Sequence, residues 1–252
     1  MTPAQRARLE IREKRHTGST RGLAPGYVQC NLAVVPQALA FDFLLYCQRN
    51  ARACPVLEVC DPGSPEPRQL APGADLRTDL PKYCVYEKGR GREAADIRGL
   101  WRKDLVAFLI GSGITFDAAL ERAGVPTDRY RWVLSSRIPT VPAGRFRGDM
   151  AVTMRWLTPG QAIVATQVSS RFPYNHGAPI HIGDPSAIGA DLAQPLFGGA
   201  VPALPKGMVP VFWACGVTPQ QAALASGIEF MIAHAPAHGF VTDLEADKFC
   251  IP

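Results

Sequence analysis

The sequence predicts an α/β fold, and three observations support this prediction. The chain has 252 residues, of which 47% are hydrophobic and 19% are charged. This balance is typical of a chain that buries a core, since disordered chains carry too little apolar material to offset the entropy lost on ordering. Segments with helical and with strand character alternate along the chain, and no repeat or long linker interrupts them. The length fits one large domain, or one domain with a smaller insert.

The first half of the chain alternates helices with short strands. Helices are expected over residues 3–14, 36–49 and 116–123, the last of them stopped by Gly124. Strands are expected over residues 28–35, 55–60 and 82–86, with an exposed Pro/Gly-rich loop over 61–73. Residues 104–110 fit either a buried strand or the end of a helix, because periodicity alone does not separate the two.

The second half predicts a hairpin and a further strand and helix. Residues 130–134 are expected to be extended, and two strands over 150–156 and 162–169 are joined by the turn-forming string Thr158-Pro159-Gly160. A strand over 209–214 precedes a helix that begins at Pro219. We interpret residues 117–172 as a smaller inserted α-β part, with the main α/β body formed by residues 1–116 and 173–252.

The charge and the apolar segments of the chain indicate which partners it binds and in which compartment it is found. The net charge is +5, but Lys and Arg are scattered, so we expect a small anionic metabolite and no nucleic acid. The apolar runs are shorter than the roughly 20 residues that span a bilayer, so no membrane association is expected. The start of the chain lacks an apolar signal core, and Glu10 and Glu13 interrupt its arginines, which favours a cytoplasmic protein. The sequence leaves open whether identical chains assemble.

Cysteine and glycine patterns indicate no organic cofactor. Seven cysteines without a paired CxxC spacing predict free thiols in a reducing compartment. The string Gly111-Ser112-Gly113 lacks the Lys-Ser/Thr pair of a phosphate-binding P-loop. We therefore expect neither disulfides nor a nucleotide cofactor.

The string HGAPIHIGDP, residues 176–185, is the first candidate for chemistry. It carries His176, His181 and Asp184 on a loop shaped by glycine and proline. A histidine exchanges protons near neutral pH, and a neighbouring carboxylate can orient it, so an acid/base pair is one interpretation. The alternative is that one histidine is a core residue and Asp184 caps a helix that begins at Pro185. A metal site from the three side chains is chemically allowed, but its spacing is not specific.

Two further strings carry candidates. In GADLRTDLP, residues 73–81, Arg77 can bind a carboxylate through two parallel hydrogen bonds, or it can pair with Asp75 or Asp79. In residues 212–220, small residues follow a buried strand, and Cys215 is either a nucleophile or a buried thiol. The segment from His234 to His238 contains a proline that disfavours a helix, and it can form a wall of a pocket.

Together these strings resemble the D-glutamate cyclase family, whose bacterial members are called hydro-lyases. The resemblance rests on residues 26–32 (GYVQCNL), GADLRTDLP, HGAPIHIGDP and residues 210–220 (PVFWACGVTPQ), and it spans roughly Thr17 to Asp243. It implies an α/β fold with a three-layer α-β-α body and a smaller two-layer α-β part. It also implies chemistry that needs no redox cofactor, while a divalent metal stays open.

The activity implied by this resemblance is the cyclisation of D-glutamate to 5-oxo-D-proline with loss of water. Such a site takes a proton from the ammonium, gives one to the departing oxygen and stabilises charge on the carboxyl oxygens. His176 and His181 would share the proton transfers, Asp184 would orient one of them, and we expect these residues to line one pocket with Arg77 and the Cys215-Gly216 backbone. The other candidates are Arg77 for the α-carboxylate, Cys215 in catalysis, and Asp75, Asp79, Gln29, Asn31, Ser112 and Gly216 in substrate binding.

Two segments depart from the family pattern. Ser112 stands where many relatives have a cysteine, and residues 135–144 are shortened relative to a string that relatives carry there. If that string lines the pocket, substrate choice differs here. Two alternatives therefore stand beside the cyclase: a hydro-lyase or amidohydrolase of another small acid, and a metabolite-binding protein without catalysis.

Overall fold

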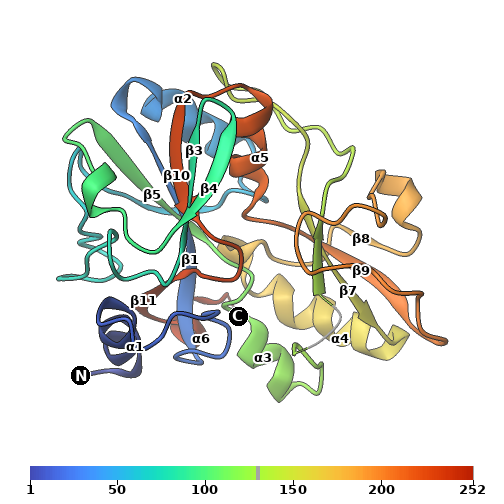
Figure 1. Cartoon of the computed structure of the whole chain (residues 1–252). Helices are drawn as coiled ribbons and strands as arrows, with labels where there is room; N and C mark the ends of the chain where they lie inside the picture. Colours follow the sequence, from blue (N-terminus) through green and yellow to red (C-terminus); the bar gives the residue numbers. More distant parts are fainter. Residues whose placement is uncertain (129–130, 252) are drawn as a thin grey trace.

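The computed structural model describes residues 1–128 and 131–251, and it confirms the α/β class (Figure 1). Within these residues the strands form two sheets in which all pairings are antiparallel. The larger sheet has seven strands: β1 (Tyr27–Pro36), β2 (Val56–Val59), β3 (Tyr83–Glu87), β4 (Arg90–Ala94), β5 (Leu105–Gly111), β10 (Phe230–His234) and β11 (Phe240–Glu245). The smaller sheet has four: β6 (Arg131–Leu134), β7 (Val152–Leu157), β8 (His181–Ile182) and β9 (Val209–Ala214).

Helices cover both faces of the larger sheet, so the body has three layers. Its strand order is β2-β5-β1-β10-β3-β4, and β11 pairs with the first half of β1. Along β1, Leu32 and Val34 face one core, whereas Ala33 and Val35 face the other. The second core contains residues of the helices α2 (Gln37–Arg49) and α5 (Thr218–Ala225). The first core contains residues of α3 (Asp117–Arg122), α4 (Pro159–Ser170) and α6 (Ala246–Phe249), and α1 (Pro3–Arg12) packs on β11.

The smaller sheet and α4 form the two-layer part. Helix α4 packs on β7 and β9, and Trp132, Met154 and Trp156 form a separate core on the sheet. Strands β8 and β9 come from residues 181–214, beyond the segment 117–172 that we assigned to this part. A folding unit bounded at residues 117 and 172 stays a prediction.

One predicted element is wrong. Residues 162–169 were expected to be a strand, but they lie within α4. The string that we interpreted as a turn is a helix start: the Thr158 hydroxyl accepts from the Gln161 amide, the Gln161 side chain accepts from the Thr158 amide, and Pro159 takes the first helical position. This reciprocal capping satisfies two amides that a helix start otherwise leaves unpaired.

The other predicted helices and strands are confirmed, with ends shifted by a residue or two. Residues 104–110, which the sequence left open, are strand β5. Of the predicted extended segment 130–134, residue 130 lies outside the described residues, and β6 begins at Arg131. All seven cysteines are free thiols, as predicted. Within the described part of the chain, no helix is long and apolar enough to cross a bilayer.

The larger sheet is interrupted between β10 and β11, and loops gather at this interruption. Strands β10 and β11 follow one another along β1, with Ala33 opposite Ala233 and Cys30 opposite Phe240. Residues 235–239 leave the sheet between them, opposite the middle of β1 where Asn31 lies. The end of β5 reaches the same level, since Gly111 pairs with Cys30. Loops from three strands therefore converge at one point of the larger sheet.

Candidate functional site

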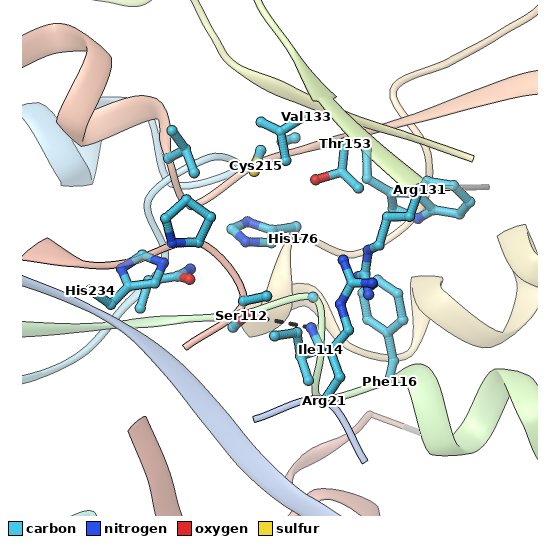
Figure 2. A pocket seen from close by; sticks show the side chains of 18 of the residues that line it. Arg21, Ser112, Ile114, Phe116, Arg131, Val133, Thr153, His176, Cys215 and His234 are labelled. Atoms are coloured by element: carbon cyan, nitrogen blue, oxygen red, sulfur yellow. Dashed lines mark hydrogen bonds between the residues drawn. The ribbon is translucent and has the colours of Figure 1, made fainter. Parts of the chain in front are cut away.

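A pocket lies where this convergence meets the smaller sheet. Its walls come from the middle of β1, the loop after β5, strands β6 and β7, the turn after β9 and residues 234–237 (Figure 2). The cavity volume is about 70 Å³. Because one water needs roughly 10–15 Å³ measured in this way, the cavity holds a small ligand or a few waters. Among the described lining residues three are arginines and none is acidic.

Two of these arginines face one another across the smaller sheet. Arg131 on β6 is directly opposite Arg155 on β7, and Val133 is opposite Thr153. Because side chains alternate along a strand, these four residues point to the pocket, while Trp132 and Met154, which lie between them, point to the core behind. Like charges placed directly opposite one another destabilise a sheet. Such a pair is therefore expected only where an anion compensates it.

Asp117 at the start of α3 supplies part of that compensation. Its carboxylate accepts hydrogen bonds from Arg155 at 2.5 Å and from Arg131 at 2.7 Å. Burial would raise the pKa of Asp117, but the two guanidiniums outweigh it and hold that pKa below its ordinary value. One carboxylate thus faces two cations, and one positive charge is left over.

Arg155 has donors that the protein does not use. The residue is 1% exposed, and its Nε and Nη1 atoms are buried without a hydrogen-bond partner in the described part of the chain. Its guanidinium lies 5.9 Å from the ring centre of Phe116 and 5.5 Å from that of Trp213. Burial, followed by the like charge of Arg131, lowers the pKa of Arg155 to about 10. The group therefore stays cationic at neutral pH. A buried cation with unpaired donors beside a cavity indicates an anionic ligand.

Arg21 adds a third cation at the mouth of the pocket. It lies in the loop between α1 and β1, which is fastened to the opposite wall because the Ala237 carbonyl accepts from the Thr20 amide, the Thr20 hydroxyl and the Ser19 hydroxyl. Arg21 is exposed as a residue, yet surrounding protein desolvates its guanidinium. This desolvation and the charge of Arg131 lower its pKa to about 9. Within the described residues Arg21 forms no ion pair.

His176 is a buried histidine that lines the pocket. It is 3% exposed and follows the short helix η2 (Pro173–Asn175) in a left-handed conformation, with a φ of 77°. Its Nδ1 lies 3.1 Å from the carbonyl oxygen of Arg52. Since a carbonyl only accepts, Nδ1 carries the proton and Nε2 keeps a free lone pair. Burial lowers the pKa of His176 to about 4, so the ring is neutral at pH 7.

Cys215 lies at the end of β9, directly before α5, and it lines the same pocket. Burial raises the pKa of its thiol, although the Thr153 hydroxyl, the Val217 amide and the nearby arginines act in the opposite direction. The thiol is therefore protonated at neutral pH. This state disfavours nucleophilic attack by Cys215, because the thiolate is the nucleophilic form.

The remaining predicted pocket residues are Asn31, Ser112 and Gly216, and all three line the cavity. The Asn31 amide donates to the Gly111 carbonyl, and Asn31 approaches Gly216 so closely that a Cβ there would lie 1.8 Å from its Nδ2. Only glycine permits this contact. The Ser112 carbonyl accepts from Asn175, which fixes the loop after β5. The amides of Gly113 and Gly216 have no acceptor within the described residues.

The structure does not bring Arg77 to this pocket, so our expectation of one pocket is wrong for the GADLRTDLP string. Arg77 donates to both carboxylate oxygens of Asp75 at 2.9 and 2.8 Å, in a surface groove beside α1. Asp79 is buried and accepts from Arg12 at 2.8 and 2.6 Å. Each cation here has its own carboxylate, and the internal ion pair is the interpretation that holds.

The expectation of one pocket is also wrong for His181 and Asp184, neither of which lines it. Gln29, a candidate for substrate binding, does not line the pocket either. His181 Nε2 lies 2.8 Å from the backbone oxygen of Asp184, and the Asp184 carboxylate accepts from the Ser186 amide and hydroxyl. Asp184 thus caps the short helix that begins at Pro185, which is the alternative we considered. The Gln29 amide donates to two carbonyls of the Arg21 loop.

The sequence analysis missed the three arginines, whereas His234 lies in the segment that was expected to form a wall of a pocket. A signal was present for one arginine, because Arg155 is the only charged residue in strand β7. A lone charge in a buried strand indicates a buried partner or ligand. The shortened segment 135–144 contributes no residue to the pocket lining. In the described part of the chain, no group of three or more His, Cys, Asp and Glu side chains is arranged to hold a metal ion.

Comparisons with known proteins agree on one family. Residues 106–243 match the family model described as D-glutamate cyclase. A Bacillus licheniformis protein named "Putative hydro-lyase" is 51% identical over 249 residues, covering 96% of this chain and 95% of its own length. Proteins with the same name from Geobacillus kaustophilus (50% identity, 97% and 95% covered) and Rubrobacter xylanophilus (51% identity, 95% and 95% covered) are similarly close. The matched segment contains Arg131, Arg155, His176 and Cys215.

Proposed function

The chain belongs to the D-glutamate cyclase family, and on this premise we propose that it is a cytoplasmic hydro-lyase that cyclises D-glutamate to 5-oxo-D-proline. The observation that carries the proposal is the unpaired guanidinium of Arg155 beside a small pocket with three arginines. The seven free thiols support the compartment, since free thiols are typical of reducing surroundings.

The charge of the pocket suits a small dicarboxylate. Among the described residues, Asp117 is the one carboxylate that forms ion pairs with Arg21, Arg131 or Arg155, so two positive charges remain for a ligand. A substrate with two carboxylates supplies two negative charges. The Arg155 donors are pre-arranged for one carboxylate, because ring contacts and the bond to Asp117 hold its guanidinium in place. Arg21 can meet the second carboxylate at the mouth.

Cyclisation transfers two protons from nitrogen to oxygen. The amine nitrogen forms a bond to the γ-carboxyl carbon and one carbon–oxygen bond breaks. The ammonium loses two protons in total, and the departing oxygen gains both as it leaves as water. His176 suits this transfer because its neutral Nε2 can take a proton from the ammonium and deliver it to the oxygen. Bound carboxylates would stabilise the protonated ring during the transfer.

The pocket also favours the folded form of the substrate. Five-membered ring closure needs the amine close to the γ-carboxyl carbon, and a cavity of about 70 Å³ leaves little room for an extended chain. Holding reacting groups together in this way lowers the entropic part of a barrier. The free Gly113 and Gly216 amides can stabilise charge that develops on the carboxyl oxygen.

The test is turnover followed by chiral chromatography of the product. Purified protein is incubated with D-glutamate, L-glutamate, D-aspartate and D-glutamine, and 5-oxoproline is measured with thermal shifts recorded for the same compounds. We expect 5-oxo-D-proline from D-glutamate, a loss of roughly 10² to 10⁴-fold in His176→Ala, and little change in His181→Ala. Turnover of a different acid would show that the substrate is that acid and not D-glutamate. A thermal shift without turnover of any compound would favour a metabolite-binding protein.

A further inference from the structure

His234 is a second buried histidine of the pocket, and the proton transfer described above does not use it. It ends β10, is 4% exposed and lines the cavity together with His176 (Figure 2). Burial lowers its pKa to about 4, so the ring is neutral at pH 7. A neutral ring can either accept or donate a hydrogen bond at the nitrogen facing the ligand, and its tautomer decides which.

Gln220 on α5 makes the contacts that decide the tautomer. Its side-chain nitrogen lies 3.3 Å from the backbone oxygen of His234 and 3.3 Å from His234 Nδ1, while its side-chain oxygen accepts from the Tyr86 hydroxyl at 2.9 Å. A backbone oxygen only accepts, so the Gln220 atom that faces it must be the amide nitrogen. The phenol of Tyr86 holds the other end of the amide, which keeps this orientation.

With this orientation, His234 Nδ1 is placed to accept. If Nδ1 carried the proton, two buried donors would face each other and one Gln220 proton would lose its acceptor, at a cost of about 1–3 kcal/mol. The Leu32 carbonyl, at 3.4 Å, is the competing acceptor for an Nδ1 proton, so the tautomer is decided by the Gln220 proton that would lose its acceptor and not by distance. Nε2 therefore carries the proton and is the ring's donor. This is the tautomer opposite to that of His176, whose Nδ1 donates to Arg52.

We propose that His234 is a catalytic hydrogen-bond donor, which stabilises negative charge on the γ-carboxyl oxygen during ring closure, and that Gln220 and Tyr86 are positioning residues that fix its tautomer. This inference rests on the proposed cyclisation. The two histidines then divide the work: His176 moves protons, and His234 stays neutral and donates. A neutral imidazole is well suited to this role because it adds a directed donor without a charge that would repel the ammonium.

The test compares Gln220→Glu with Gln221→Glu, its neighbour on α5, which does not line the pocket. A carboxylate at position 220 only accepts hydrogen bonds, so it favours the neutral tautomer whose proton is on Nδ1 and whose Nε2 carries none. We expect kcat to fall roughly 10² to 10³-fold, as for loss of one oxyanion donor, with KM changed less than about threefold. Gln221→Glu should keep both constants. Tyr86→Phe is the milder variant, and kcat should fall less with KM again retained.

Nitrogen-15 NMR of ring-labelled histidine reads the tautomer directly and needs no substrate. We expect an Nε2-protonated His234 in the wild type and an Nδ1-protonated ring in Gln220→Glu. An Nδ1-protonated ring in the wild type would overturn the inference, as would a switched tautomer with kcat unchanged. A wild type that turns over no D-glutamate would instead defeat the proposed function, while the spectrum would still decide whether Gln220 positions His234.

Discussion

Arginine and aspartate meet in two regions of this protein, and the two regions differ in how the charges are matched. Beside α1, Arg77 pairs with Asp75 and Arg12 pairs with Asp79, one cation to each carboxylate. At the pocket, Arg131 and Arg155 share the single carboxylate of Asp117.

The first arrangement is complete within the protein, whereas the second leaves donors and positive charge available to a ligand. Both are bidentate or shared contacts of good geometry, so geometry alone does not separate them. What separates them is whether the unused donors of the cation are buried, as they are for Arg155, or exposed to solvent, as at Arg77 and Arg12. An arginine string in a sequence therefore predicts a ligand site only when no nearby carboxylate can satisfy it.

The largest effect that would test this comparison is on catalysis. We expect Arg155→Met to lower kcat/KM for the proposed substrate by roughly 10² to 10⁴-fold, since a buried charged hydrogen bond to the ligand is lost. Arg77→Met should stay within about twofold of the wild type, because the Arg77 side chain pairs with Asp75 and lies outside the pocket. Arg155→Lys separates charge from donor geometry and is expected to recover part of the loss. Equal losses in Arg77→Met and Arg155→Met would remove the distinction between the two regions.

Most of the fold could be predicted because local signals agree with the tertiary structure. The helix at residues 37–49 follows Pro36 and has an apolar face that packs into a core. The failure at residues 162–169 has a physical reason: Ile163, Val164 and Val168 have high strand propensity. The capping signal of Thr158 and Gln161 outweighed it, and that signal was readable in the sequence.

The site was predictable only in part. His176, Cys215, Gly216, Asn31 and Ser112 line the pocket as expected. His181 and Asp184 do not line it, because their polar atoms form hydrogen bonds within their own loop.

Apart from the lone charge of Arg155 in β7, the arginines could not be found by local reasoning. Arg131 and Arg155 are 24 positions apart, and they meet only through the register of β6 against β7. Arg21 comes from a loop that is fixed to Ala237, more than two hundred positions away. Short sequence motifs show which side chains could bind a ligand or transfer a proton. Strand register and loop contacts decide which of these side chains share a cavity.

A medium effect is expected on the pH dependence of stability. The pKa values of His176 and His234 fall from 6.5 to about 4 on folding, because both rings are buried. The unfolded chain therefore takes up protons below pH 6.5 that the folded chain refuses until about pH 4, so stability is lost as the pH falls through this window. Each pKa unit is worth about 1.4 kcal/mol, which makes a loss of several kcal/mol measurable by urea unfolding.

The matched variants are His176→Gln and His181→Gln. Replacing His176 should remove about half of this histidine contribution between pH 6.5 and pH 4, because His234 supplies the rest, whereas replacing His181, which lies outside the pocket, should leave the wild-type slope. If the unfolding free energy of His176→Gln depended on pH as strongly as that of the wild type, the pKa of His176 would not be lowered by folding.

The smallest effects should come from the region beside α1, and they should fall on stability alone. Asp79 is fully buried and accepts from Arg12, from the Thr78 hydroxyl and from the Asp75 amide, so Asp79→Asn should cost about 1–3 kcal/mol of unfolding free energy. Asp75 and Arg77 are 26% and 33% exposed at their side chains, and solvent screens their ion pair. Asp75→Asn should therefore cost less than about 1 kcal/mol. Urea unfolding measures both differences, and kcat/KM should stay within about twofold in each variant. A tenfold fall of kcat/KM in Asp75→Asn without a matching loss of stability would show that the groove beside α1 takes part in catalysis. One-to-one pairing of charges would then not distinguish a structural region from a ligand site.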